Sequence, residues 1–200
     1  MVLYLIIGAI AISISSALGF TIGVTNIVVS HLEVFLQIII TFFTLLILDI
    51  IFAFMIRWFP KKWVNPFNKI YKVHNWEKKF YVKLGVRKWK DLIPESGKAL
   101  VGFDKRNVAA MNDNEYLKKF MEESVIAELM HIISFVVSAI LLFIPFRLAI
   151  IVRLPIILAN MIFQIMPVFV QRYNRPKLML AYERNIRLQQ RKQKNEEIKG

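Results

Sequence analysis

An acid and an imidazole stand three residues apart at the start of an apolar segment of the chain, at Glu128 and His131. On a helix this spacing places both side chains on one face, within hydrogen-bonding distance of each other. A carboxylate that orients an imidazole is the arrangement that a general base needs to take a proton from a hydroxyl. The spacing therefore predicts catalytic roles, with His131 as the base and Glu128 as its orienting partner. The alternative interpretation is structural, with an acid in the first turn of a helix and a histidine at the membrane surface.

A dense cluster of hydrogen-bond donors occupies residues 171–176, with the sequence Gln-Arg-Tyr-Asn-Arg-Pro. Paired arginines suit phosphate, carboxylate or sugar hydroxyl groups. The positive charge that commonly follows a membrane span would explain the arginines, but it would not explain the tyrosine and asparagine between them. We therefore expect this run to end the last membrane helix and to bind substrate through Arg172, Tyr173, Asn174 and Arg175.

Three polar side chains inside apolar segments are further candidates. Ionisable groups at membrane depth are costly and usually face the interior of a helix bundle. Asp49 is therefore a candidate for substrate binding, near the depth expected for Glu128, and its alternative role is to pair with an arginine such as Arg172. Asn160 and Gln164 lie four residues apart on one face, and we expect them to hold helices together rather than to bind substrate.

The elements that must position these residues are membrane helices, because apolar and charged residues are segregated along the chain. Hydrophobic residues make up 56% of the 200 residues, and Lys and Arg number 0 in residues 1–56, 16 in 57–126, 2 in 127–170 and 9 in 171–200. About 20 apolar residues suffice for a helix to cross a bilayer, and a helix satisfies its own backbone hydrogen bonds there. We expect an all-α integral membrane protein that forms a single membrane domain over residues 1–200. Its four transmembrane helices are predicted as two hairpins, at residues 2–30, 34–56, 129–146 and 154–170.

The charge distribution also predicts the topology. Short loops rich in Lys and Arg stay on the cytoplasmic side of a membrane. The segment 57–126 and the tail 171–200 should therefore both be cytoplasmic. The chain is then a multi-pass protein of the cell membrane with both termini in the cytoplasm. Arg147 and Arg153 on the short outer turn are a small departure from this rule.

The basic segment between the hairpins has the composition of a membrane-surface element. It holds all four Trp of the chain among many lysines, and such residues favour the headgroup layer and anionic lipids. Trp76, Phe80 and Leu84 recur at helical spacing, which predicts one or two amphipathic helices in the interface. The segment either anchors the protein or also binds substrate, with Trp89 and Arg106 as candidates. Anionic headgroups explain the net charge of +13, so we expect no nucleic-acid partner.

Several enzyme classes are excluded. The chain has no Cys, which excludes thiol nucleophiles, disulfides and metal sites built on thiolates. It carries no Walker loop, serine-hydrolase elbow, zinc-protease motif or dinucleotide-binding glycine motif. A di-iron bundle would need a second Glu-x-x-His pair and two further carboxylates, which the chain does not supply. We therefore expect no metal and no cofactor.

Five motifs of the cytoplasmic segments carry a family resemblance. They are Trp-Glu-Lys-Lys-Phe-Tyr at 76–81, Arg-Lys-Trp-Lys at 87–90, Asp-Lys-Arg at 104–106, Ala-Glu-Leu-Met-His at 127–131 and Gln-Arg-Tyr-Asn-Arg-Pro at 171–176. In that order, over about residues 76–177, they resemble the glycosyl-4,4'-diaponeurosporenoate acyltransferase family. Members are small integral membrane proteins, and the carotenoid-pathway member is assigned transfer of a fatty acyl group to the sugar hydroxyl of a glycosylated carotenoid acid, the last step towards staphyloxanthin.

The resemblance implies a bacterial membrane acyltransferase that acts on a hydroxyl of a carotenoid glycoside or a similar lipid-linked sugar. The acyl donor would be a co-substrate, and membrane lipids with anionic headgroups would be partners. Under this hypothesis Arg172, Asn174 and Arg175 bind the acyl donor or the sugar. Two alternatives remain, a membrane alkyl or methyl transferase with a nucleotide-like donor and a non-catalytic lipid-binding scaffold.

Overall fold

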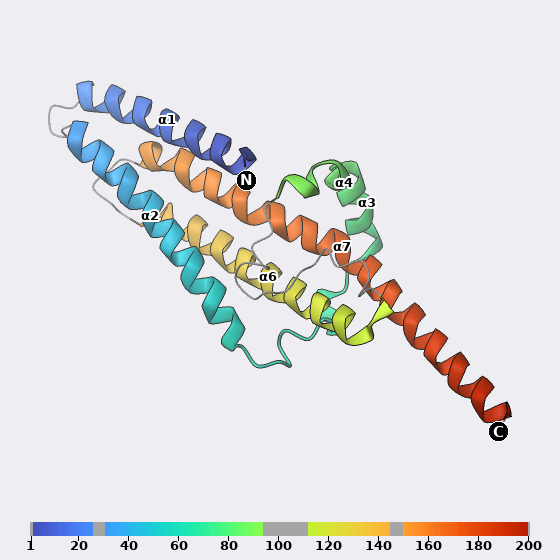
Figure 1. The fold of residues 1–200 in the computed structure, drawn as a ribbon. Helices are drawn as coiled ribbons and strands as arrows, with labels where there is room; N and C mark the ends of the chain where they lie inside the picture. The colour runs from blue at the N-terminus through green and yellow to red at the C-terminus, as the bar shows by residue number, and fades with distance from the viewer. Residues whose placement is uncertain (1, 26–30, 94–111, 145–149, 200) are drawn as a thin grey trace. The chain divides into compact units, whose positions relative to one another are not determined.

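The computed structural model describes residues 2–25, 31–93, 112–144 and 150–199. Within these ranges the regular elements are all helical, and no strand is present, which confirms the predicted all-α class. In chain order they are α1 (Val2–Thr25), α2 (His31–Met55), η1 (Ile56–Trp58), η2 (Lys69–Tyr71), α3 (Asn75–Lys83), α4 (Val86–Trp89), η3 (Lys90–Leu92), α6 (Asn114–Leu141) and α7 (Ile150–Lys199), as labelled in part in Figure 1.

Four of these helices, α1, α2, α6 and α7, are long and apolar enough to cross a membrane. Helix α1 has 24 residues and α2 has 25. At about 1.5 Å per residue each exceeds the roughly 30 Å of a hydrocarbon core. The predicted number of long apolar helices is therefore confirmed. Their order across the bilayer and the side on which the termini lie stay predictions.

Helix α6 begins earlier than its apolar sequence does. The predicted span was 129–146, whereas the helix runs from Asn114 to Leu141. Its start is capped by Asp113, whose carboxylate accepts a hydrogen bond of 2.8 Å from the backbone N–H two residues later. Leu117, Met121 and Val125 recur every fourth residue and are fully buried. This buried apolar face extends the helix into the charged segment.

Helix α7 continues beyond its predicted end. We expected the run 171–176 to end the last membrane helix, but the helix is unbroken from Ile150 to Lys199. Proline inside a helix removes one hydrogen bond and usually ends or bends it. After Pro176, however, Leu178 packs against Leu117 and Met121 of α6. We attribute the continuation of the helix past the proline to this packing.

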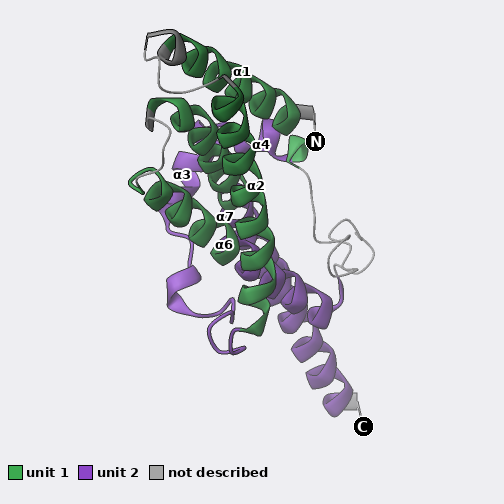
Figure 2. Ribbon diagram, turned by 90° about the vertical axis from the view of Figure 1, so that its left-hand side faces the viewer, with its two compact units in different colours: residues 1–58, 91–93, 129–168 green, residues 59–90, 94–128, 169–200 purple. Residues whose placement is uncertain are grey.

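The chain divides into two compact units, coloured separately in Figure 2. Unit 1 comprises residues 1–58, 91–93 and 129–168, and unit 2 comprises residues 59–90, 94–128 and 169–200. The core of unit 1 joins α2 to α7 through six buried aliphatic side chains: Val34, Ile38, Leu45, Val152, Ile156 and Ile157.

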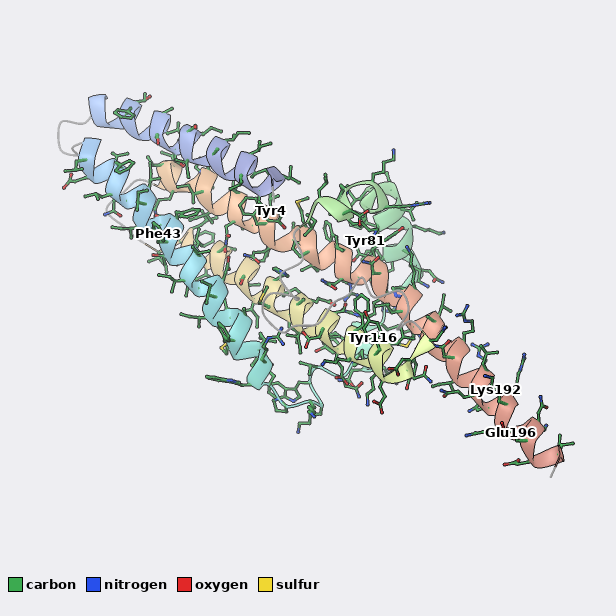
Figure 3. All side chains as sticks on the ribbon, viewed as in Figure 1. Tyr4, Phe43, Tyr81, Tyr116, Lys192 and Glu196 are labelled. Atoms are coloured by element: carbon green, nitrogen blue, oxygen red, sulfur yellow. The ribbon has the colours of Figure 1, made fainter. Side chains whose placement is uncertain are left out.

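Helix α1 belongs to unit 1 and lies beside α2 (Figure 1). It also contacts α7 through Tyr4, whose ring centroid is 4.5 Å from that of Phe163 and whose hydroxyl lies 3.5 Å from the Phe163 carbonyl oxygen. Many other apolar side chains of α1 and α2 are exposed, as Phe43 is in Figure 3. Exposed apolar helix faces of this kind are those that lipid covers in a membrane protein.

Arg153 has a structural role in unit 1. Its guanidinium donates hydrogen bonds to the carbonyl oxygens of Leu141 and Ile144, at 3.3 and 3.2 Å, and its side chain is buried. A helix leaves its last carbonyl groups without helical partners, and a cation there also interacts well with the helix dipole. Arg153 thus closes the C-terminal end of α6, which explains one of the two positive charges expected on the outer turn. Arg147 lies outside the described residues.

Helix α3 in unit 2 exposes its apolar face. Trp76 and Phe80 are 67% and 42% exposed, and Leu84 directly after the helix is 41% exposed. The neighbouring face, about 100° further around the helix, buries Glu77 and Tyr81. An apolar stripe turned outward fits the expected position at a membrane surface, which stays a prediction.

Candidate functional site

The first polar centre lies in unit 2 and is built around Arg172 on α7. Its Nε donates to a carboxylate oxygen of Glu77 on α3 at 2.7 Å, and its Nη1 donates to a carboxylate oxygen of Glu128 on α6 at 2.6 Å. Both acids are nearly fully buried. One guanidinium therefore joins three helices through charge-assisted hydrogen bonds, the strongest class of hydrogen bond in proteins.

Arg175, one helical turn further along α7, completes this buried ion cluster. Its Nη2 lies 2.5 Å from the second carboxylate oxygen of Glu128 and 3.2 Å from the hydroxyl of Ser124. Its Nη1 donates to the Tyr71 carbonyl oxygen at 3.3 Å, and the guanidinium carbon is 5.8 Å from the centre of the Tyr71 ring. The side chain of Arg175 is 2% exposed. Two acids and two arginines balance, which makes their burial tolerable.

Glu77 is held in its ionised form by its neighbours. Burial by itself raises the pKa of this carboxyl, but the hydrogen bond from Arg172, the bond from the backbone N–H of His74 and the charge of Arg172 outweigh it, so the pKa lies below its usual value. The hydroxyl of Tyr81 also donates to Glu77, at 3.2 Å. Burial, then the adjacent charge of Glu77, raises the pKa of Tyr81 to about 12. Figure 3 shows Tyr81 on α3, where its ring centroid is 5.6 Å from that of Phe169 on α7.

The second polar centre lies in unit 1 and is built around Gln164 on α7. The amide nitrogen of Gln164 donates to a carboxylate oxygen of Asp49 on α2 at 2.7 Å. Its amide oxygen is 2.7 Å from Nδ1 of His131 on α6. Asn160 extends the centre, since it donates to the hydroxyl of Ser138 at 2.9 Å. The expectation that Asn160 and Gln164 hold helices together is thus confirmed.

The chain Asp49–Gln164–His131 assigns the proton on the imidazole. A carboxylate only accepts hydrogen bonds, so the amide nitrogen of Gln164 must face Asp49 and its oxygen must face His131. With Asp49 ionised, Nδ1 of His131 therefore donates to Gln164, and in the neutral ring the basic lone pair is then on Nε2. A base oriented by an amide, which a carboxylate orients in turn, follows the same principle as a catalytic triad.

The remaining predicted site residues are Trp89, Tyr173, Asn174 and Arg106. Trp89 donates from its indole N–H to the Leu84 carbonyl oxygen at 3.1 Å and packs against the buried residues Val73, Tyr81 and Val86. Tyr173 packs against the same three residues. Asn174 is half-buried on α7, next to Tyr173, and Arg106 lies outside the described residues.

Glu128 and His131 have different principal partners in the structure. Both oxygens of Glu128 are engaged by arginines, whereas Nδ1 of His131 is engaged by Gln164. Arg172 pairs with Glu77 and Glu128, and Asp49 accepts a hydrogen bond from Gln164. The proposed action of Glu128 on His131 stays a prediction.

Glu77 was missed by the sequence reasoning, although a signal was available. It is the only acid between residues 57 and 90, a stretch rich in Lys and Arg. It also stands three residues after His74 at the start of α3, where a glutamate side chain commonly reaches back to the backbone N–H before the helix. A single acid surrounded by cations is a candidate for a buried ion pair.

The family of the chain follows from comparison with known proteins. No curated protein and no solved structure matches it significantly. A family model described as glycosyl-4,4'-diaponeurosporenoate acyltransferase matches residues 67–184. This range contains α3, the whole of α6, and the parts of α7 that carry Gln164 and the two buried arginines. The chain therefore belongs to the glycosyl-4,4'-diaponeurosporenoate acyltransferase family.

Proposed function

We propose that this protein is a membrane acyltransferase that moves a fatty acyl group onto a hydroxyl of a membrane glycolipid, a carotenoid glycoside or a similar lipid-linked sugar. Family membership supports the transferase class and a glycosyl carotenoid as acceptor. The hydrogen-bonded chain Asp49–Gln164–His131 is the single observation that carries the mechanism. It supports His131 as a base of fixed tautomer within helices apolar enough to lie in a membrane.

In the proposed reaction Nε2 of His131 takes the proton from the sugar hydroxyl as its oxygen attacks the carbonyl carbon of the acyl donor. A new C–O ester bond forms, and the bond between the acyl carbon and the leaving group of the donor breaks. The proton on Nε2 then passes to the leaving group, so the base is regenerated and no other reactant is needed. Asp49 and Gln164 hold the ring in place, and the buried ion cluster around Arg172 and Arg175 supports the binding of the donor or the sugar.

The test compares two substitutions of His131 in a strain that lacks the native gene. His131→Ala removes both ring nitrogens, whereas His131→Asn keeps a donor that can reach Gln164 but has no nitrogen equivalent to Nε2. We expect both variants to accumulate in the membrane and both to lose acyl transfer, by a factor of about 10² or more, as is typical for loss of a general base. Mass spectrometry of the lipid extract should then show the unacylated glycolipid and little of its ester.

Gln164→Leu is the matched variant for the positioning role. It preserves the size of the side chain and removes the hydrogen bond to Nδ1, so the pH dependence of acyl transfer should shift while the protein stays folded. Full acyl transfer by His131→Asn would refute the role of the imidazole. An unchanged glycolipid profile in the deletion strain would refute the acyltransferase function itself.

A further inference from the structure

A cleft of about 350 Å³ opens on unit 2 between the segment 66–73 and α7. This volume is within the range of small-molecule sites in proteins, about 300–1,000 Å³. Three lysines line it, Lys69, Lys72 and Lys78, together with Arg175 and one acid, Glu183. The excess of positive charge favours an anionic ligand.

Two of the residues that line the cleft, Tyr71 and Arg175, are buried and held in place by neighbouring groups. Tyr71 is buried, and its hydroxyl donates to the Trp63 carbonyl oxygen at 2.5 Å. Arg175 is fixed against the Tyr71 ring and against Glu128. Among the residues that the structure describes, the buried Nε–H of Arg175 has no hydrogen-bond partner.

Apolar side chains line the same cleft. Phe67, Met179 and Leu180 contribute to its walls, and Phe67 and Leu180 are 44% and 65% exposed. The Phe67 ring is 5.4 Å from that of Tyr182, so the segment is fastened to α7 beside the cleft. Lysines next to exposed apolar groups suit an amphiphile in which a phosphate is joined to a hydrocarbon chain.

We propose that this cleft binds the phosphate-bearing group of the acyl donor. The inference rests on the proposed function for the identity of the ligand as a donor, but the binding of phosphate can be measured without any reaction. Lys69, Lys72 and Lys78 contact the phosphate, and Arg175 forms the fixed base of the site. Two donor classes share this chemistry, a phospholipid and an acyl thioester of coenzyme A.

The experiment measures binding to the full-length protein in uncharged detergent by tryptophan fluorescence and calorimetry. The probes are short-chain phosphatidylglycerol, a short-chain acyl coenzyme A, and a short-chain diacylglycerol that lacks phosphate. The test variant is the triple substitution of Lys69, Lys72 and Lys78 by Gln. The control variant replaces by Gln three exposed lysines of unit 2 that do not line the cleft, namely Lys61, Lys79 and Lys83.

We expect one of the two phosphate probes to bind and the diacylglycerol to bind much more weakly. The test variant should weaken that binding by about tenfold or more, equivalent to about 1.4 kcal/mol, and the control variant by less than about twofold. In an acyl-transfer assay the same test variant should raise KM for the donor and leave kcat nearly unchanged. Whichever phosphate probe binds identifies the donor class.

Equal loss of binding in the test and control variants would overturn the proposal, because general surface charge would then explain the affinity. Equal binding of diacylglycerol and the phosphate probes would overturn it as well. If phosphate binding depends on the three cleft lysines but the protein transfers no acyl group, the cleft stands and the proposed function fails. If acyl transfer occurs and its KM for the donor is unaffected by the triple substitution, the function stands and the cleft proposal fails.

Discussion

Glu128→Gln is the sharpest test of the buried ion cluster. The carboxylate of Glu128 is 3% exposed and contacts Arg172 at 2.6 Å and Arg175 at 2.5 Å. The substitution keeps the shape of the side chain but leaves the four-residue cluster with a net charge of +1. Two unit charges about 4 Å apart interact by roughly 4 kcal/mol at an effective dielectric constant near 20. The cost of removing one partner of a buried pair is about 3–5 kcal/mol, because the other charge stays buried.

Thermal unfolding in detergent, followed by tryptophan fluorescence, measures this cost. Three of the four tryptophans, Trp63, Trp76 and Trp89, belong to the same unit as the cluster, so the signal reports on it directly. For a chain of this size 1 kcal/mol corresponds to about 2–4 °C in Tm, so we expect a decrease of at least about 6 °C. Glu122→Gln on the same helix removes an equal charge from a partly exposed side chain and should shift Tm by less than about 2 °C.

A second substitution separates charge from shape. Arg175→Met in the Glu128→Gln background returns the cluster to zero net charge and should recover part of the lost stability. A decrease in stability below about 1 kcal/mol for Glu128→Gln would show that the ion pairs are hydrated like pairs on a protein surface. That result, or a double variant less stable than the sum of the two single variants, would refute the burial argument.

Three further predictions concern other contacts. Because the pKa of Glu77 is lowered in the folded protein, its ionised carboxylate stabilises the fold above the usual glutamate pKa, and this stabilisation is lost as the pH falls through the folded pKa. Glu77→Gln should therefore be less stable than the unmodified protein near neutral pH and should lose less stability in acid. Tm measured against pH checks both expectations. Arg153→Met removes two charge-assisted hydrogen bonds at the end of α6 and should cost about 1.5–3 kcal/mol in denaturant unfolding; an unchanged stability would contradict the capping role. A Cβ at Gly19 would collide with the buried side chain of Val34, so Gly19→Ala should destabilise the protein by about 1–3 kcal/mol. A Cβ at Gly8 would have open space, so Gly8→Ala should be neutral or slightly stabilising because alanine has the higher helix propensity. Equal effects of the two substitutions on stability would exclude close packing as the cause.

The long helices could be predicted from the sequence, but two of their boundaries could not. Apolar runs longer than a bilayer indicate helices regardless of tertiary contacts, and α1 and α2 follow this rule. The start of α6 and the continuation of α7 past Pro176 depend on packing between Leu117 and Leu178, residues far apart in the chain. Proline and charge are local signals, and a tertiary contact of this kind overrides them.

The residue types of the candidate site could be predicted from the sequence, but the contacts between those residues could be predicted less well. Rare polar residues in apolar segments pointed to Asp49, Glu128 and His131, because an ionisable group there needs a compensating contact. The pairing depends on the rotation of each helix, which spacing along one helix does not give. Sequence spacing favoured Glu128 as the partner of His131, while the structure engages the imidazole through Gln164 on another helix.

Exposed tryptophan and phenylalanine side chains are usually replaced by polar residues to make a protein more soluble, but helix α3 is an exception to this practice. Its buried face carries Glu77 and Tyr81, and its outward face carries Trp76 and Phe80, followed directly after the helix by Leu84. Redesign for solubility would begin with these three side chains and would remove the apolar stripe by which the helix could rest on lipid. Detergent screening is therefore a better route to a working sample than surface mutation.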